Sequence, residues 1–231
     1  MKGRHHHATW LRAQIESPLR DQKLLVAAEM AAVVLIPALW GLLPLPRTIM
    51  PLLLLGWLSL GLRRLGWRDV GWRHPESWLR TLGFGIAIGA FAEILGYTVV
   101  NPMLLRLTGG AATANGLAFL QGNLPAFLVL LAFTWPLAAV VEEMVYRGYV
   151  LNRLADLFGQ SRLGWGISLM LSAVMFSLAH GQYGPRFIVT SSLMGLIEGG
   201  SYLLNRRNLW LPIVVHGMSN TISLALLFLG L

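Results

Sequence analysis

Residues 124–151 read LPAFLVLLAFTWPLAAVVEEMVYRGYVL, and this stretch decides the fold. Its first 18 residues carry no charge, which is long enough for a helix to cross the hydrocarbon core of a bilayer. Two adjacent glutamates, Glu142 and Glu143, then interrupt the apolar run, and Arg147 follows four residues after Glu143. The stretch therefore predicts a transmembrane helix that carries charged side chains within the membrane.

The composition of the whole chain agrees with a membrane protein. Of its 231 residues, 55% are hydrophobic and only 12% are charged, about half of the roughly 25% that is usual for a soluble domain. This balance excludes an ordinary soluble globular domain and intrinsic disorder. The chain contains no cysteine, which excludes disulfides, thiolate metal sites and cysteine nucleophiles.

Apolar segments at intervals along the chain predict an all-α, polytopic transmembrane bundle of about seven spans (six to eight), with an active-site cavity inside it. The spans are expected at 24–43, 49–62, 79–100, 124–151, 164–181, 187–204 and 209–229. The chain is interpreted as a basic N-terminal segment at 1–23 and a single transmembrane domain at 24–231. A short amphipathic surface helix is expected around Trp10, Leu11 and Ile15.

The distribution of lysine and arginine predicts the orientation in the membrane. With a cytoplasmic N-terminus and alternating spans, the inner segments carry 15 of these residues and the outer segments carry three, namely Arg47, Arg106 and Arg186. We therefore expect a multi-pass protein of the plasma (inner) membrane with its C-terminus outside. Contact with anionic lipid accounts for the net charge of +8, so nucleic acid is not an expected partner.

Acidic residues inside the spans are the candidates for function. They are Glu29, Glu93, Glu142, Glu143 and Glu198. A charge at the bilayer centre costs roughly 2.5–3.5 kcal/mol on insertion scales, so each such residue needs a reason. Glu29 and Glu93 are more simply explained as interior carboxyls that bond to a neighbouring helix. For Glu198, beside the small-residue face of Gly195 and Gly199, structural and functional explanations both stay open.

The adjacent pair Glu142 and Glu143 is not equivalent. Glu143 and Arg147 have the i, i+4 spacing of a helical ion pair, with the acid in the favourable N-terminal position. Glu142 points to another side of the helix and has no such partner, so it is free to act as a general base. The alternative is a purely structural ion pair at the end of the span.

Two histidines in later spans complete a candidate site. Phe176 precedes His180 by one helical turn, and His216 precedes Asn220 by one turn. Glu142 with His180 could deprotonate a water, while His216 and Asn220 could donate hydrogen bonds to an oxyanion. Such a set is sufficient for amide hydrolysis inside the membrane. A second option is a divalent metal such as zinc held by His180, His216 and Glu142, although no cofactor is required by the sequence.

Other designs of intramembrane protease do not fit the chain. An aspartyl mechanism needs two aspartates in the spans, but Asp21, Asp69 and Asp156 all fall outside the predicted ones. The zinc motif HExxH is absent. Ser219 lies between His216 and Asn220 but lacks a glycine-flanked loop.

The three motifs resemble those of the CPBP family of intramembrane proteases, named for CAAX-processing and bacteriocin-processing members and also called the Abi family. The family pattern EExxxR, FxxxH and HxxxN is matched in order by Glu142-Glu143-x-x-x-Arg147, Phe176-x-x-x-His180 and His216-x-x-x-Asn220. The resemblance covers about residues 124–229, which it identifies as the catalytic core.

The resemblance implies an activity and roles for the motif residues. Glu142, His180, His216 and Asn220 would be catalytic, and Glu143, Arg147 and Phe176 would orient the site. The implied activity is hydrolysis of a peptide bond in a membrane-associated, prenylated or CAAX-like protein or peptide. Some relatives are thought to be non-catalytic regulators or immunity proteins that bind a membrane partner, which gives the alternative function. A proton-coupled transporter using Glu29, Glu93 and Glu198 is a third, weaker interpretation.

The expected span boundaries leave a problem of depth. Glu142 and His216 lie about ten and eight residues from the inner ends of their spans, whereas His180 lies 16 residues from Gly164. The three side chains can meet only if the span at 164–181 is strongly tilted or begins below the membrane surface.

Overall fold

A computed structural model describes residues 22–40, 49–108 and 115–231, and every regular element in these ranges is helical. The elements are α2 (Lys23–Trp40), α3 (Met50–Leu62), α4 (Trp78–Leu95), η1 (Gly96–Val100), α5 (Asn101–Thr108), η2 (Asn115–Leu120), α6 (Leu124–Phe133), η3 (Thr134–Glu142), η4 (Met144–Val150), α7 (Leu151–Phe158), α8 (Arg162–Ala179), η5 (Gly181–Tyr183), α9 (Pro185–Leu204) and α10 (Trp210–Leu229). Each of the seven predicted spans corresponds to a helix. The surface helix expected around Trp10 lies outside the described residues.

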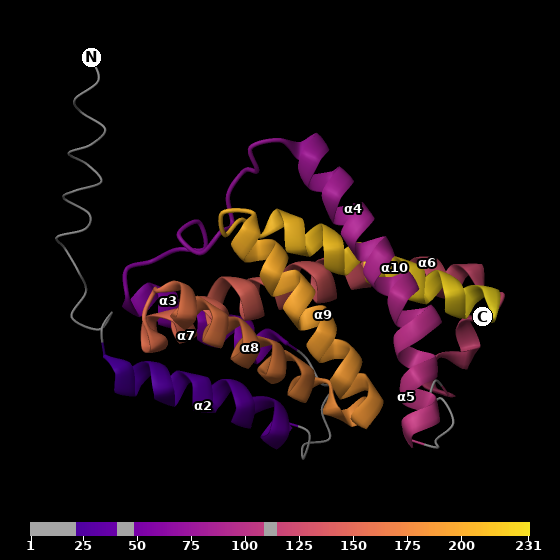
Figure 1. Ribbon diagram of the computed structural model, residues 1–231, viewed down its shortest axis with the longest axis horizontal. Helices are drawn as coiled ribbons and strands as arrows, with labels where there is room; N and C mark the ends of the chain where they lie inside the picture. Colours follow the sequence, from indigo (N-terminus) through magenta and orange to yellow (C-terminus); the bar gives the residue numbers. More distant parts are fainter. Residues whose placement is uncertain (1–21, 41–48, 109–114) are drawn as a thin grey trace.

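Five helical segments are long and apolar enough to cross a membrane. They are Trp78–Leu107, Leu124–Phe158, Arg162–Ala179, Pro185–Leu204 and Trp210–Leu229, and α3 is a shorter apolar helix. The prediction of an all-α transmembrane bundle is therefore confirmed. Figure 1 shows α9 and α10 diverging from the loop that joins them, with α4 lying next to α10.

The segment from α6 to α7 is one helix that is π-helical in its middle. Residues 134–142 and 144–150 form the two π-helical stretches η3 and η4. Pro136 lies at the start of η3, where it has no N–H to donate and its ring would clash with the carbonyl four residues earlier in an α-helix. A wider turn relieves that clash, and π-helical segments occur frequently at functional sites.

The length of this helix brings the depths of Glu142 and His180 into agreement. The helix does not end near residue 151, as the sequence suggested, but continues through α7 to Phe158. Glu142 therefore lies 16 residues from the C-terminal end of this helix, and His180 lies 18 residues from the start of α8 at Arg162. His216 lies only six residues from the start of α10 at Trp210. The predicted boundary was wrong because α7 turns polar, with Arg153 and Asp156 ion-paired at 2.9 Å.

Glycines bring α4 and α10 close together. A methyl group on Gly85 would lie 2.6 Å from the side chain of Val214, and one on Gly89 would lie 2.5 Å from the carbonyl oxygen of Val215. Small residues of this kind let membrane helices approach until their backbones touch. The contact fixes the helix that carries His216.

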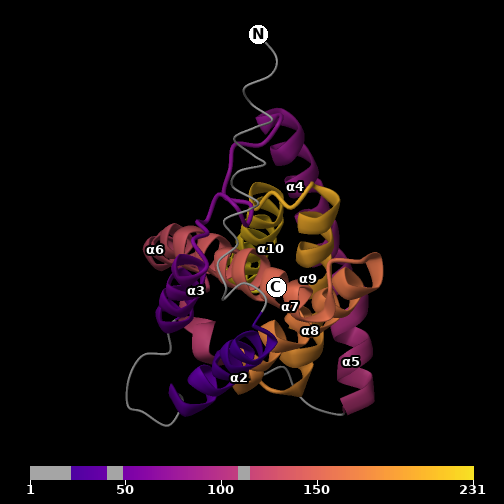
Figure 2. The same ribbon diagram turned by 90° about the vertical axis from the view of Figure 1, so that its left-hand side faces the viewer.

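Glu29 lies in a buried polar cluster on the N-terminal side of the bundle. Its carboxylate accepts hydrogen bonds from Arg63 Nη1 at 2.7 Å and Ser59 Oγ at 2.9 Å. Tyr149 Oη also donates to it, at 3.4 Å. In Figure 2, α2 and α3 lie beside the central helices, and this cluster joins them to η4. Glu29 thus bonds to a neighbouring helix, as the sequence indicated.

Glu93 joins α4 to α10. Its carboxylate accepts hydrogen bonds from Ser219 Oγ, at 2.6 Å, and from Ser223 Oγ. The carboxyl thus bonds to a neighbouring helix, as the sequence indicated. Glu29 and Glu93 do not contact each other in the described part of the chain. The structure therefore gives no support to a proton path between them, as the transporter interpretation would need.

We predict that Gly89→Ala destabilises the protein whereas Gly83→Ala does not. The new methyl at residue 89 would meet the backbone of α10, and overpacking of this kind costs about 1–3 kcal/mol. A methyl at residue 83, on the same helix, would meet nothing within 4 Å and would raise helix propensity. Thermal unfolding of the two purified variants in detergent tests this. Equal melting temperatures for both variants would contradict the close packing of α4 on α10.

Candidate functional site

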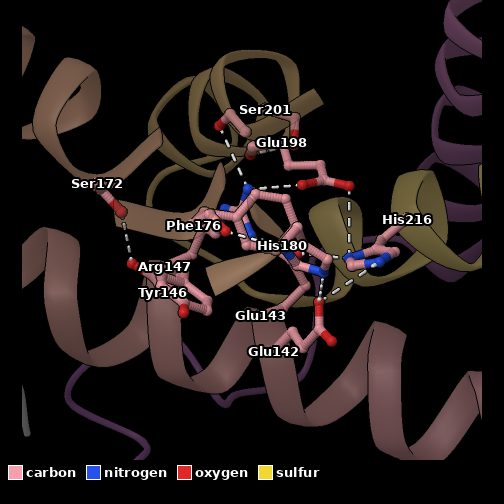
Figure 3. Close-up of polar contacts among 11 residues, drawn as sticks. Glu142, Glu143, Tyr146, Arg147, Ser172, Phe176, His180, Glu198, Ser201 and His216 are labelled. Carbon is pink, nitrogen blue, oxygen red and sulfur yellow. Dashed lines mark hydrogen bonds and ion pairs between the residues drawn. The ribbon is translucent and has the colours of Figure 1, made fainter. Parts of the chain in front are cut away.

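Arg147 lies at the centre of a buried group of charged side chains (Figure 3). Its Nη1 donates to Glu143 Oε1 at 2.8 Å, and its Nη2 donates to Glu198 Oε2 at 2.5 Å. Nη2 also lies 3.3 Å from the carbonyl oxygen of Gly195. The guanidinium therefore bridges two carboxylates from two helices, and the i, i+4 pairing of Glu143 with Arg147 is as predicted.

Burial makes this bridge necessary. Glu143, Arg147 and Glu198 are each at most 1% exposed. A buried carboxylate without a cation is strongly unfavourable, and arginine is suited to two carboxylates because its donors form a rigid fork. The ring of Phe176 covers the guanidinium, with Arg147 Cζ 4.7 Å from its centroid. Phe176 thus packs on the site, and its orienting role stays a prediction.

His216 contacts two carboxylates with one edge of its ring. Nδ1 lies 2.8 Å from Glu143 Oε1 and 3.4 Å from Glu198 Oε1. Glu143 Oε1 already accepts from Arg147 Nη1, so it is the acceptor in this contact and His216 Nδ1 is the donor. The other edge, Nε2, points towards Glu142 Oε2 at 3.9 Å.

His180 approaches Glu142 from another helix in a similar way. Its Nδ1 lies 2.9 Å from the carbonyl oxygen of Phe176, which can only accept, so Nδ1 is the donor. Its Nε2 lies 3.9 Å from Glu142 Oε2. In the neutral ring, Nε2 therefore presents a lone pair towards the carboxyl group.

The distances around Glu142 fit a bridging water. At 3.9 Å, both nitrogen–oxygen separations are too long for direct hydrogen bonds. Polar groups at such a separation are commonly joined by a water that bonds to both. The side chains of Glu142 and His180 are 17% and 21% exposed, whereas those of Arg147 and Glu143 are buried. Water can therefore reach the side of the site where Glu142 and His180 lie.

Asn220 is the sequence-predicted residue that the structure does not connect to the others. It is half-buried, one turn after His216 on α10, and its side chain makes no hydrogen bond with any described residue. Its amide is thus available to a ligand.

Two surface hollows, of about 400 and about 170 Å³, lie against α3 and between α4 and the α9–α10 loop, and site residues line neither of them.

Glu198 is the residue whose place in the site the sequence left open. It contacts both Arg147 and His216, although it is not in any of the three motifs. The face of Gly195 and Gly199 does pack closely, since a methyl on Gly195 would lie 3.0 Å from Ala173 Cα on α8. A glutamate in a span beside two glycines was the available signal, but its partners could not be found from spacing.

The part of the chain that holds this site matches a known family. Residues 123–222 match the model of the family described as type II CAAX prenyl endopeptidase Rce1-like. These residues form an Rce1-like domain. The resemblance to the CPBP family is thereby confirmed, and the matched segment of this domain holds all seven motif residues. No curated protein and no solved structure matches the chain.

A metal ion does not fit the ligand atoms of the Rce1-like domain as they lie. Atoms of Glu143, Glu198 and His216 lie within 4.8 Å of one another, but the cationic Arg147 already binds both carboxylates. Glu142, His180 and His216 have suitable donors, yet two ligands of one tetrahedral zinc ion lie only about 3.4 Å apart. Separations of 3.9 Å exceed this value.

We predict that Arg147→Met strongly destabilises the protein. It would leave the buried carboxylates of Glu143 and Glu198 without their cation, which costs about 3–5 kcal/mol. The control is Arg206→Met, which breaks an ion pair with Glu76 whose side chains are 79% and 67% exposed. Such a pair contributes little. Thermal unfolding should show a large loss for the first variant alone, and similar losses for both would contradict the central role of Arg147.

Proposed function

We propose that the protein is an intramembrane endopeptidase that hydrolyses a peptide bond with a water activated by Glu142 and His180. Membership of residues 123–222 in the Rce1-like family supports an endopeptidase of the CAAX type in general. The observation that carries the catalytic proposal is the approach of two histidine Nε2 atoms to one carboxylate oxygen, each at 3.9 Å.

The first step is attack by water. Glu142 takes a proton from the water, and the lone pair of His180 Nε2 accepts the water's other hydrogen and orients it. The water oxygen forms a bond to the carbonyl carbon, whose π electrons move onto the carbonyl oxygen. Glu142 then passes its proton to the leaving nitrogen as the C–N bond breaks.

The oxyanion needs hydrogen-bond donors. Asn220 can supply its amide N–H. Because Nδ1 of His216 is committed to Glu143, the donor from this ring is Nε2–H, and the ring must then carry both protons. A cationic ring also offsets the negative charge of the nearby carboxylates.

The substrate is a membrane-associated protein or peptide, and we propose a prenylated or CAAX-like segment because of the family match. Five apolar helices long enough to span a bilayer make this an integral membrane protein. We further propose a plasma (inner) membrane location with the N-terminus in the cytoplasm and the C-terminus outside, on the basis of the lysine and arginine distribution.

We predict that Glu142→Gln abolishes hydrolysis while the protein stays folded. The amide has almost the same shape as the carboxyl but cannot accept a proton, and loss of a general base lowers the rate by about 10²–10⁴-fold. Purified protein in lipid nanodiscs is incubated with a farnesylated peptide that ends in a CAAX sequence, and mass spectrometry measures release of the C-terminal residues. Wild type should cleave and His180→Ala should be inactive.

A matched control is Glu93→Gln, since Glu93 lies in the same bundle but contacts Ser219 and Ser223 and not the site. It should cleave like wild type. Full cleavage by Glu142→Gln would disprove the general-base role. If Glu142→Gln instead keeps the cellular function and wild type cleaves nothing, the protein is a non-catalytic membrane regulator.

We also predict that hydrolysis persists after exhaustive treatment with a metal chelator. Glu142 and His180 activate the water in this proposal, so no ion is obligatory. The measurement is peptide cleavage after dialysis against EDTA, with elemental analysis of the same sample. Loss of cleavage that zinc restores would overturn the metal-independent mechanism.

A further inference from the structure

Glu198 faces two different partners with its two carboxylate oxygens. Oε2 accepts from Arg147 Nη2 at 2.5 Å, and Oε1 lies 3.4 Å from His216 Nδ1. The residue is 1% exposed and comes from α9, whereas Arg147 and His216 come from η4 and α10. Glu198 therefore links three helices at the Nδ1 edge of the ring.

Glu143 alone is poorly placed to hold a doubly protonated His216. Its Oε1 is shared by Arg147 Nη1 and His216 Nδ1, both at 2.8 Å. Its Oε2 is buried and has no hydrogen-bond partner among the described residues. One oxygen of Glu143 thus serves both Arg147 and His216. The carboxylate of Glu198, at the same edge of the ring, supplies additional negative charge.

We infer that Glu198 is a positioning residue of this site, which together with Glu143 holds His216 as a two-proton ring with Nε2–H directed at the oxyanion. This inference rests on the proposed function for its catalytic consequence. The charged groups that face the ring support its protonated form. These are the carboxylates of Glu142, Glu143 and Glu198 and the single guanidinium of Arg147.

Replacement of Glu198 by glutamine tests the charge without changing the shape. A glutamine has one acceptor and one donor group in its head. If its oxygen stays on Arg147, its NH₂ faces the hydrogen on His216 Nδ1, and two donors then point at each other. The second carboxylate is lost, and the ring is expected to release its Nε2 proton.

The first measurement does not depend on catalysis. Nitrogen-15 NMR of the histidine rings, with His216→Gln used for assignment, reports whether each ring nitrogen carries a proton. In wild type at neutral pH we expect both nitrogens of His216 to be protonated. In Glu198→Gln we expect Nε2 to lose its proton. An unchanged His216 spectrum in this variant overturns the inference.

The second measurement is cleavage of the farnesylated CAAX peptide. An interaction that acts only in the transition state lowers kcat and leaves KM nearly unchanged. Loss of an outer-shell partner that orients a histidine in a metal site typically costs about 10–100-fold, and we expect kcat of Glu198→Gln to fall by a similar factor. Glu93→Gln is the matched control, because the serine hydroxyls around Glu93 can both donate to and accept from an amide. Equal kcat values in the two variants contradict the inference.

The two proposals fail in different ways. If wild type does not cleave the peptide but Glu198→Gln deprotonates His216, the endopeptidase is wrong and the role of Glu198 stands. If Glu142→Gln is inactive but Glu198→Gln has normal kcat and a protonated His216, only the role of Glu198 is wrong. Should Glu198→Gln not fold, Glu198→Asp replaces it. This variant keeps the charge, so a protonated ring with a smaller fall in kcat is expected, and a neutral ring with full activity contradicts the inference.

Discussion

The structure depends on one buried guanidinium that serves two carboxylates. Arg147 of η4 pairs with Glu198 of α9. It also pairs with Glu143, which in turn bonds to His216 of α10. In a low-dielectric interior each of these charges is costly alone, so the helices must meet where the charges compensate one another. Three helices of the Rce1-like domain are thereby fixed relative to each other at the site.

The buried ion pairs of Arg147 divide the site into a closed part and an open part. Arg147 and its two carboxylates lie under the ring of Phe176 and are sealed from solvent. Glu142 and His180 lie on the other side and are partly exposed. The closed part holds the compensating charges, and the open part is the side that solvent can reach. Neighbouring glutamates on one helix thus have different surroundings, as their one-residue offset requires.

Much of this could be predicted from the sequence. The uncharged run before Glu142 indicated a membrane helix. The match of three motifs in the chain to a family pattern indicated that Glu142, His180 and His216 would lie together. Two features were beyond sequence reasoning. The end of the long helix was placed too early, because Arg153 and Asp156 neutralise each other and let a polar segment continue the helix. The contact of Glu198 with His216 depends on how α9 and α10 cross, which no local spacing records.

The π-helical stretch has a consequence for how the chain can vary. A π-turn holds about one more residue than an α-turn, so loss of one residue from η3 or η4 can be absorbed by conversion of a π-turn to an α-turn, which leaves the helix beyond it in nearly the same orientation. That part of the helix presents Arg147 to Glu198 and Tyr149 to Glu29 on different sides. Both sets of contacts therefore share one rotational register. A change of length in the α-helical parts of this segment would instead rotate both sets of contacts together, because an α-helix has no extra residue to give up.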